Sequence, residues 1–338
     1  MAFDVRDSTN DATIATVPLS DLDGRSQLAV IAKWAFRVSA HGVVERIPSS
    51  KTEIDLVDTF NGDDPGKSSI RRPSQLFAKK PGTDVILLAH AQPRAGASYA
   101  DVSLRIGMMH KTVRAHGLRV WQASAFGAVS PGPARPLREP IPLVYELAWG
   151  GQDLGDPMKP LGEPRNYAGR GISRDPKSLV DKPAAQLEYP DKPVGGRNNV
   201  PAAFNPIHRH WQPRASYAGT YDEKWMETRM PLLPTDFDDR FNICVPPDQW
   251  SELPLRSDEP MEVLGATTEG IWRFQLPRIV PGFSSVILGR RQEHRTHLDT
   301  ILIDADERRV ELTWRAAVPL PRKYEMVDRI IVFEKDVV

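Results

Sequence analysis

The sequence predicts a mainly β fold, and three observations support this. Apolar and polar residues alternate with a period of two before residue 130 and again after residue 260. Helical periodicity is weak throughout. Proline is abundant, with 31 in 338 residues, and 21 of these lie between residues 131 and 260. Proline fixes φ and lacks a backbone donor, so it interrupts helices and central strands alike. We expect one or two antiparallel, sandwich-like β units formed by the two ends of the chain, with a long irregular segment between them.

Three stretches in the N-terminal part have strand patterns. Residues 28–38 and 102–108 alternate between apolar and polar positions, the period of a half-buried strand. Residues 84–91 form a short, largely apolar run, as in a strand buried on both faces. These patterns predict an N-terminal β unit over residues 1–130.

The β pattern returns near the C-terminus. Residues 272–276 alternate, and residues 300–304 and 309–315 flank a short turn like the two arms of a hairpin. Residues 330–333 form a last apolar strand. The sequence therefore predicts a C-terminal β unit over residues 259–338. Periodicity leaves open whether it shares one core with residues 1–130.

The proline-rich segment, residues 131–258, also contains large aromatic residues, among them Trp149, Trp211, Trp225 and Trp250. Disordered tracts contain few aromatic residues, which favour burial. We therefore expect an ordered but irregular segment, held by aromatic packing and by hydrogen bonds from side chains to the backbone. Its best short helix candidates are residues 221–230 and 247–253.

Composition and charge exclude several classes of protein. The chain has 44 Lys+Arg against 44 Asp+Glu, whereas a dedicated nucleic-acid binder usually has a net basic charge. The N-terminus lacks the basic start and apolar run of a secretory signal, and no apolar stretch approaches the ~20 residues that span a bilayer. The single cysteine, Cys244, excludes an internal disulfide and fits a reducing compartment. We expect a soluble cytoplasmic protein with no nucleic-acid or membrane partner.

The candidates for a metal site or a reactive thiol are weak. Cys244 lies between apolar neighbours, which favours a buried structural thiol. His208 and His210 could present two imidazoles on one face of a strand, but no third ligand follows at metal-site spacing. The glycines of residues 169–171 are not followed by the Lys-Ser/Thr of a phosphate loop. We therefore expect neither a bound metal nor a cofactor.

Residues 234–240 are rich in acidic side chains. Asp236 and Asp238 could form a carboxylate pair for acid–base catalysis, with Asp239 beside them. Arg229 and Arg240 lie close in sequence. Salt-bridged carboxylates that anchor a proline-rich loop are therefore the preferred interpretation.

Several motifs occur in a distinctive order along the chain. The longest lies at residues 201–249, and shorter ones lie near Trp34 and Trp121. The others are KPGTDVILLAHA (80–91), PIPLVYELAWGGQD (140–153), EPRNYAGRGI (163–172), PAAQLEYP (183–190) and HLDTILIDADERRVELTWRA (297–316). This order resembles a known bacterial family, domain-of-unknown-function family 2169. The resemblance covers nearly the whole chain, with mild departures around the glycines at 150–151 and 169–171.

The resemblance implies a role in type VI secretion. Members of the family are found in gene clusters for this system, beside spike and PAAR-motif tip proteins. They are thought to act as adaptors or chaperones that load toxic effectors onto the spike. We therefore expect a non-enzymatic cytoplasmic adaptor whose partners are an effector protein, the spike protein and the PAAR-type tip protein. The family has no established catalytic residues, so none are assigned here.

One segment offers candidate protein-binding residues. Tryptophan, tyrosine and arginine dominate binding hot spots. Six such residues fall within 19 positions, namely Trp211, Arg214, Tyr217, Tyr221, Trp225 and Arg229. The alternative is that these side chains fill the core beneath irregular loops.

Two other functions stay open at this point. One is a hydrolytic enzyme or secreted toxin that uses His208, His210, Asp236 and Asp238. The other is a structural component of the secretion particle. The sequence names neither the effector nor the oligomeric state.

Overall fold

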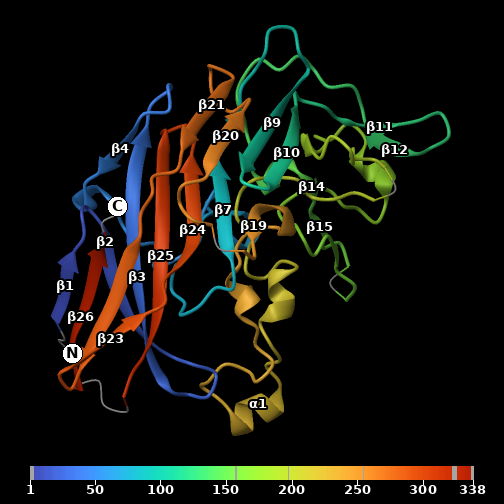
Figure 1. The fold of residues 1–338 in the computed structure, drawn as a ribbon. Helices are drawn as coiled ribbons and strands as arrows, with labels where there is room; N and C mark the ends of the chain where they lie inside the picture. The colour runs from blue at the N-terminus through green and yellow to red at the C-terminus, as the bar shows by residue number, and fades with distance from the viewer. Residues whose placement is uncertain (1–3, 157, 197, 254, 322–325, 336–338) are drawn as a thin grey trace.

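The computed structural model describes residues 4–156, 158–196, 198–253, 255–321 and 326–335. Strands account for 41% and helical turns for 10%, which confirms the predicted mainly β fold. The largest sheet has seven strands in the order β19-β7-β24-β25-β3-β2, with β4 also paired to β3 (Figure 1). Its strands are β2 (Thr13–Ser20), β3 (Ser26–Val38), β4 (Val44–Ile47), β7 (Thr83–Leu88), β19 (Trp250–Ser251), β24 (His297–Asp304) and β25 (Arg309–Pro319).

Two further sheets complete the β framework. A five-stranded sheet, in the order β18-β10-β9-β20-β21, is formed by β9 (Tyr99–Ile106), β10 (Met109–His116), β18 (Leu187–Glu188), β20 (Pro260–Leu264) and β21 (Ile271–Gln275). A four-stranded sheet, in the order β1-β26-β22-β23, is formed by β1 (Asp4–Ser8), β22 (Pro281–Ile287), β23 (Arg290–His294) and β26 (Val327–Glu334).

The proline-rich middle segment is ordered but irregular. Its α-helix, α1 (Glu223–Thr228), has six residues, and no helix in the described ranges is long and apolar enough to cross a membrane.

Short elements outside the three larger sheets complete the described structure. Five small strand pairs are β5 (Thr59–Phe60) with β6 (Ile70–Arg72), β8 (His90–Ala91) with β13 (Ile141–Pro142), β11 (Trp121–Ala123) with β12 (Val129–Pro131), β14 (Trp149–Gly150) with β17 (Arg170–Gly171), and β15 (Gln152–Asp153) with β16 (Leu161–Gly162). Short 3-10 turns lie at Ser49–Lys51, Pro65–Lys67, Tyr145–Leu147, Pro176–Leu179, Arg214–Tyr217, Asp239–Asn242 and Pro247–Gln249.

Strands from the two ends of the chain lie side by side. In the seven-stranded sheet, β25 pairs antiparallel with β3 over the whole length of β25, from Gln27↔Pro319 to Arg37↔Arg309. Two parallel pairs, β7 with β24 and β1 with β26, interrupt the otherwise antiparallel pattern of these sheets. Both are pairings between the N-terminal and C-terminal parts, so neither part completes the sheets alone.

One face of the seven-stranded sheet is apolar and lies in the main core. Alternate residues of β3, from Leu28 to Val38, are buried there together with alternate residues of β25, from Val310 to Val318. The same cluster includes side chains of the other two sheets and of the middle segment, such as Trp272 and Phe204. This continuous cluster joins the three sheets into one sandwich-like body.

The opposite face of the same sheet contains a row of buried polar side chains. Five of them lie directly opposite one another on five neighbouring strands, in the order Thr13, Lys33, Thr313, Thr300 and Asp84. Each of the last four is at most 5% exposed. Such groups need partners when they are buried. Those partners come from the covering loops rather than from a second sheet.

The loop formed by residues 49–80 crosses this face and bonds to the row strand by strand. The bonds, in chain order, are Thr13 Oγ1 to the Thr52 carbonyl (3.0 Å), Lys33 Nζ to Asp55 (2.7 Å), Gln75 Nε2 to Thr313 Oγ1 (2.9 Å) and Lys80 Nζ to Thr300 Oγ1 (3.0 Å). The Cys244 amide then donates to Asp84 at 2.8 Å and brings in the middle segment. We call this set of contacts the polar row.

Lys33 lies at the centre of an ionic network. Asp55 and Glu311 approach its Nζ at 2.7 and 3.4 Å, and Arg72 donates to both carboxylates. Burial alone would raise the pKa of Asp55 and of Glu311, but the adjacent cations outweigh it, so both pKa values are lowered. Both carboxylates are therefore charged in the folded protein.

Most strand predictions are confirmed, and two local predictions are wrong. Residues 247–253 form a 3-10 turn and the edge strand β19 rather than a helix, because buried Gln249 donates to the carbonyls of Val85 and Phe204. Strand 102–108 ends at Ile106, because Gly107 takes a positive φ and Met108 is fully exposed in the turn.

We predict that Glu311→Gln will destabilise the fold by about 3 kcal/mol, because it removes the charge that balances Lys33, Arg72 and Arg309 in a buried site. Urea unfolding measures the change. Glu45→Gln, at an exposed position of β4, is the matched control and should stay within about 0.5 kcal/mol of the parent. Equal effects in the two variants would contradict a stabilising role for the network.

Candidate functional site

Two of the six predicted contact residues are buried. Trp211 is 3% exposed and packs edge-on against Tyr145, with ring centroids 5.6 Å apart. Arg214 is 5% exposed and donates to the carbonyls of Phe241 and Ile207 at 3.0 and 2.9 Å. Both hold the middle segment together from within, so we leave them out of any contact surface.

The other four candidates lie in or beside a lobe formed by residues 219–237, which we call the α1 lobe. Tyr217 is partly buried beneath the Arg240 guanidinium, 4.4 Å from the ring centroid. Tyr221 is 53% exposed and packs edge-on against Trp225 at 4.7 Å. Half-buried Trp225 donates from Nε1 to the Leu232 carbonyl at 2.9 Å. Trp225 thus supports the lobe from inside, and Tyr221 lies at its surface.

Local rules explain why this lobe forms. The Asp222 side chain caps α1 by accepting from the Trp225 amide at 2.8 Å. Gly219 has φ +81°, where a side chain would be strained, and the Asp236 carboxylate then accepts from the Thr220 amide and hydroxyl. These contacts close the segment at both ends.

Arg229 fastens the lobe to the sheet. Its guanidinium donates to the carbonyl of Leu233 within the lobe and to the carbonyl of Leu22 in the turn between β2 and β3. The donors of Arg229 thus bond to backbone carbonyls, as those of Arg214 do, and the salt-bridge interpretation of residues 234–240 does not extend to Arg229. Asp238 instead pairs with Arg240 at 2.6 Å, as expected.

A groove of about 760 Å³ lies where the lobe meets the β2–β3 turn. Its lining combines apolar side chains, such as Leu22, Phe77 and Leu232, with charged ones, including Asp21, Asp23, Arg25, Lys79 and Asp239. A groove of this size and mixed lining suits a peptide segment or a side-chain cluster of another protein. It adjoins the exposed surface of the lobe.

The four residues proposed for a hydrolytic enzyme, His208, His210, Asp236 and Asp238, fall into groups with different partners. His208 stacks near His210, with ring centroids 5.2 Å apart, and burial lowers the pKa of His208 to about 4. Asp236 bonds to Thr220, and Asp238 bonds to Arg240. In the described part of the chain, no hydrogen bond or ion pair joins the two histidines to the two aspartates, so these four residues do not form one hydrogen-bonded group.

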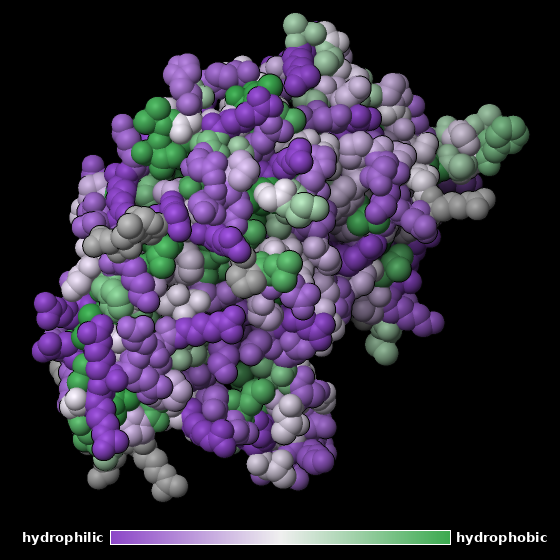
Figure 2. Space-filling model, in the orientation of Figure 1, coloured by the Kyte–Doolittle hydropathy of each residue, from purple (hydrophilic) through white to green (hydrophobic). Residues whose placement is uncertain are grey.

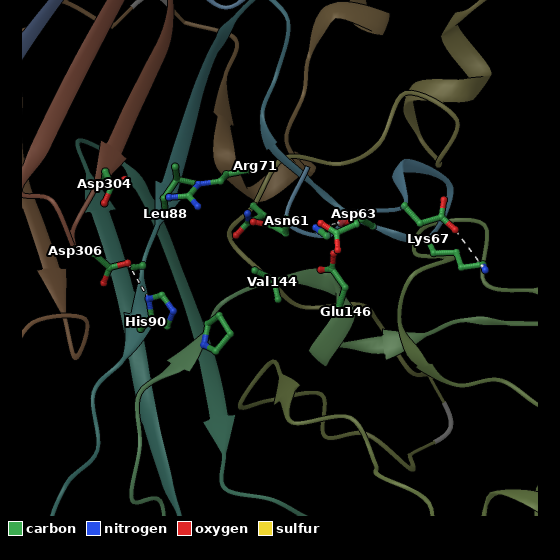
Figure 3. Close-up of a pocket in the computed structure, with 16 residues that line it drawn as sticks. Asn61, Asp63, Lys67, Arg71, Leu88, His90, Val144, Glu146, Asp304 and Asp306 are labelled. Atoms are coloured by element: carbon green, nitrogen blue, oxygen red, sulfur yellow. Dashed lines mark hydrogen bonds and ion pairs between the residues drawn. The ribbon is translucent and has the colours of Figure 1, made fainter. Parts of the chain in front are cut away.

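A second groove, of about 530 Å³, is polar and was not anticipated (Figure 3). It lies where the parallel strands β7 and β24 end. Asp304 is the last residue of β24, and His90 and Asp306 lie just beyond the two strand ends. His90 Nδ1 lies 2.8 Å from Asp306 Oδ2, and this hydrogen bond raises the pKa of His90. Burial raises the pKa of Asp304, which is 8% exposed.

The far wall of the polar groove is a loop held by one carboxylate. Glu146 accepts from the Ser68 hydroxyl at 2.9 Å and from the Ser69 amide and hydroxyl, both at 2.7 Å. These two hydroxyls therefore position the loop. Figure 3 shows Arg71 extending from it toward the strand ends near Leu88. A carboxylate-paired imidazole can exchange a proton near neutral pH. In this groove, His90 and Asp306 form such a pair and both line the cavity.

The same loop contains a near-match to a phosphate-binding sequence. Residues 62–68 have the sequence GDDPGKS, one residue shorter than G-x-x-x-x-G-K-[ST]. Here Pro65–Lys67 form a 3-10 turn, strand β6 follows instead of a helix, and Lys67 pairs with Asp64 at 3.3 Å. The phosphate cradle of that motif is therefore not formed.

Other candidate chemistry is limited in the part of the chain that the structure describes. Cys244 is 1% exposed and burial raises the pKa of its thiol, which confirms the expected buried cysteine. Within the described ranges, no group of three or more His, Cys, Asp or Glu side chains is arranged to hold a metal ion.

Comparison with known proteins gives one match. Residues 23–315 match the family described as "Uncharacterized protein conserved in bacteria (DUF2169)". The chain belongs to this family. Neither the search of curated proteins nor the search of solved structures gave a match. The DUF2169 region includes the α1 lobe, the polar groove, most of the lining of the groove beside the lobe, and most of the polar row.

We predict that Arg229→Lys will loosen the α1 lobe while the sheets stay folded, because an ammonium cannot reproduce the planar, two-carbonyl contact of the guanidinium. Amide hydrogen exchange in residues 219–237 should become about tenfold faster, which corresponds to roughly 1.4 kcal/mol of local stability. Arg25→Lys, an exposed position on the neighbouring turn, serves as control. Unchanged exchange in Arg229→Lys would show that this residue does not fasten the lobe.

We predict that Asp306→Asn will lower the pKa of His90, because the carboxylate is what favours the imidazolium form. The contact is strongest below the raised pKa of His90 and weakens as pH rises through it. Titration of the His90 ring signals by NMR measures this shift. The same titration curve in both proteins would mean that the pair does not exist in solution.

Proposed function

We propose that this DUF2169 protein is a cytoplasmic adaptor or chaperone of type VI secretion. In this role it binds an effector protein and helps to load it onto the spike protein or the PAAR-type tip protein. The family resemblance supplies the connection to secretion. The observation that supports protein binding is the surface of the α1 lobe.

Four large hydrophobic side chains are exposed on this small lobe. Tyr221 is 53%, Met226 55%, Met230 63% and Leu233 39% exposed, within 13 consecutive residues. Hydrophobic side chains scattered singly on a surface need no explanation, but a local group of them is typical of an interaction site. Figure 2 shows hydrophobic patches among hydrophilic ones at the lower end, where Figure 1 places α1.

The composition and support of the lobe fit this role. Methionine is flexible and polarisable, so Met226 and Met230 can adapt to partner surfaces of different shape. Trp225 and Arg229 hold the lobe through hydrogen bonds to backbone carbonyls, and these bonds leave the side chains of the exposed residues free. The adjoining groove offers both apolar and charged walls. An unfolded or partly folded effector segment could bind across the two.

We predict that Met226→Glu combined with Met230→Glu will weaken effector binding at least thirtyfold, about 2 kcal/mol, because it places charges where apolar contact is proposed. Calorimetry with the purified effector encoded beside this gene measures the affinity. Met108→Glu is the matched control, since Met108 is equally apolar and fully exposed in the turn between β9 and β10. Its melting temperature and effector affinity should match those of the parent.

Secretion assays test the role itself. Removal of the protein should lower delivery of one cognate effector while sheath firing continues. Loss of all type VI secretion would replace the adaptor by a structural component of the particle. Recovery of the protein in the secreted fraction as an active toxin, or full effector delivery in its absence, would overturn the proposal.

A further inference from the structure

A second element projects from the molecule far from the α1 lobe. The hairpin of β11 and β12 extends from the upper right of the body in Figure 1, and Figure 2 shows its tip as a pale hydrophobic knob. Residues 122–128 are all exposed, and Phe126 at the tip is 99% exposed. The phenyl ring is therefore almost wholly free of contact with the rest of the protein.

The hairpin is firmly held at its base. Trp121 is 4% exposed and packs in a small cluster with Ala184 and Ala185. Its amide donates to the Lys182 carbonyl at 3.0 Å, and its carbonyl accepts from the Asp181 amide at 2.9 Å. The projecting strands therefore start from a buried, hydrogen-bonded anchor.

The turn at the tip is also defined. The Ser124 hydroxyl accepts from the Ala128 amide at 3.1 Å, and the Ser124 amide donates to the Ala128 carbonyl at 2.7 Å. Gly127 takes φ +81°, a conformation that favours glycine. Phe126 is thus presented on a formed turn, which reduces the entropy that binding must overcome.

The composition of the hairpin is unusual for an exposed element. Residues 120–134 contain no charged side chain, whereas the 26% charged residues of the whole chain would place about four in a stretch of this length. Arg119, just before the stretch, is 8% exposed and pairs with Glu188 at 2.7 Å. An exposed aromatic residue on an uncharged, preformed projection differs from an isolated surface hydrophobe.

We propose that the β11–β12 hairpin docks into a folded partner protein by inserting Phe126 into an apolar pocket with an uncharged rim. The absence of charge argues for such a rim. A membrane surface is disfavoured because one aromatic side chain in a stretch that itself has no basic residue, 120–134, gives only weak anchoring. A second copy of this chain is disfavoured because both grooves described above are lined by several charged side chains.

This inference rests on the proposed adaptor function and deepens it, because an adaptor must hold two proteins at once. Figure 1 places α1 at the lower end and the hairpin at the upper right, so the two surfaces are separate. The effector would contact the α1 lobe, and the hairpin would contact the protein that receives it. The spike and the PAAR-type tip protein are the first probes to use.

Site-specific cross-linking tests the contact. A photo-reactive phenylalanine analogue placed at position 126 in the native host should cross-link to one protein, whereas the same analogue at Met108 should not. That protein is then identified, purified and titrated against the parent and against Phe126→Ala. We expect at least a tenfold loss of affinity in Phe126→Ala, a smaller loss in Phe126→Leu, and an unchanged melting temperature in both.

The other outcomes each overturn the inference. These are equal affinity of the parent and Phe126→Ala, a cross-link only to a second copy of the chain, no cross-link above the Met108 control, or Phe126-dependent flotation with phosphatidylethanolamine–phosphatidylglycerol vesicles. Effector affinity is measured separately on the same proteins. A parent protein that does not bind effector refutes the adaptor function, while the cross-link at position 126 still decides whether the hairpin docks.

Discussion

The polar row on one face of the seven-stranded sheet is the constraint on which the rest of the structure depends. A sheet buried on both faces usually has apolar side chains on both. Here the second face carries Lys33, Thr313, Thr300 and Asp84, which must find partners because they are out of water. Loops rather than a second sheet supply those partners. Leaving these buried polar groups without partners would cost free energy, so the covering loops are held in one defined path across the sheet.

This arrangement explains how a proline-rich segment can be ordered. Proline removes donors from the backbone, so such a segment cannot be held by a hydrogen-bonded ladder. Side chains take over that role, as Gln249 does for the carbonyls of Val85 and Phe204, and Arg214 for those of Phe241 and Ile207. Loops fixed in this way can present exposed apolar groups without collapsing over them.

The sequence predicted the framework better than the sites, for physical reasons. Strand periodicity is local, so the apolar face of β3 was visible in the alternation around Trp34. The same alternation gives Lys33 the appearance of a solvent-facing residue, because its partner Glu311 lies far away in the sequence. Cys244 was correctly expected to be buried. Its amide donates a hydrogen bond to Asp84, a residue distant in the sequence, and local patterns could not predict that contact.

The candidate sites depend even more on tertiary contacts. The polar groove joins five segments, and the aspartates that end one of its strands are equally typical of a turn. In the aromatic-rich stretch, composition could not separate buried Trp211 from exposed Tyr221, since both residue types serve cores and interfaces. Spacing along the chain does not encode which side of an irregular loop faces water.

The pairing of β3 with β25 has a consequence for how the chain acquires its fold during synthesis. Lys33 pairs with Thr313, about 280 residues later. At roughly 5–20 residues per second, a ribosome needs on the order of 15–60 s to make that interval. Throughout this time β2 can cover one edge of β3, but the other edge has no strand partner until β25 is made. An unpaired strand edge favours aggregation, so the nascent chain is exposed to this risk until its last strands emerge.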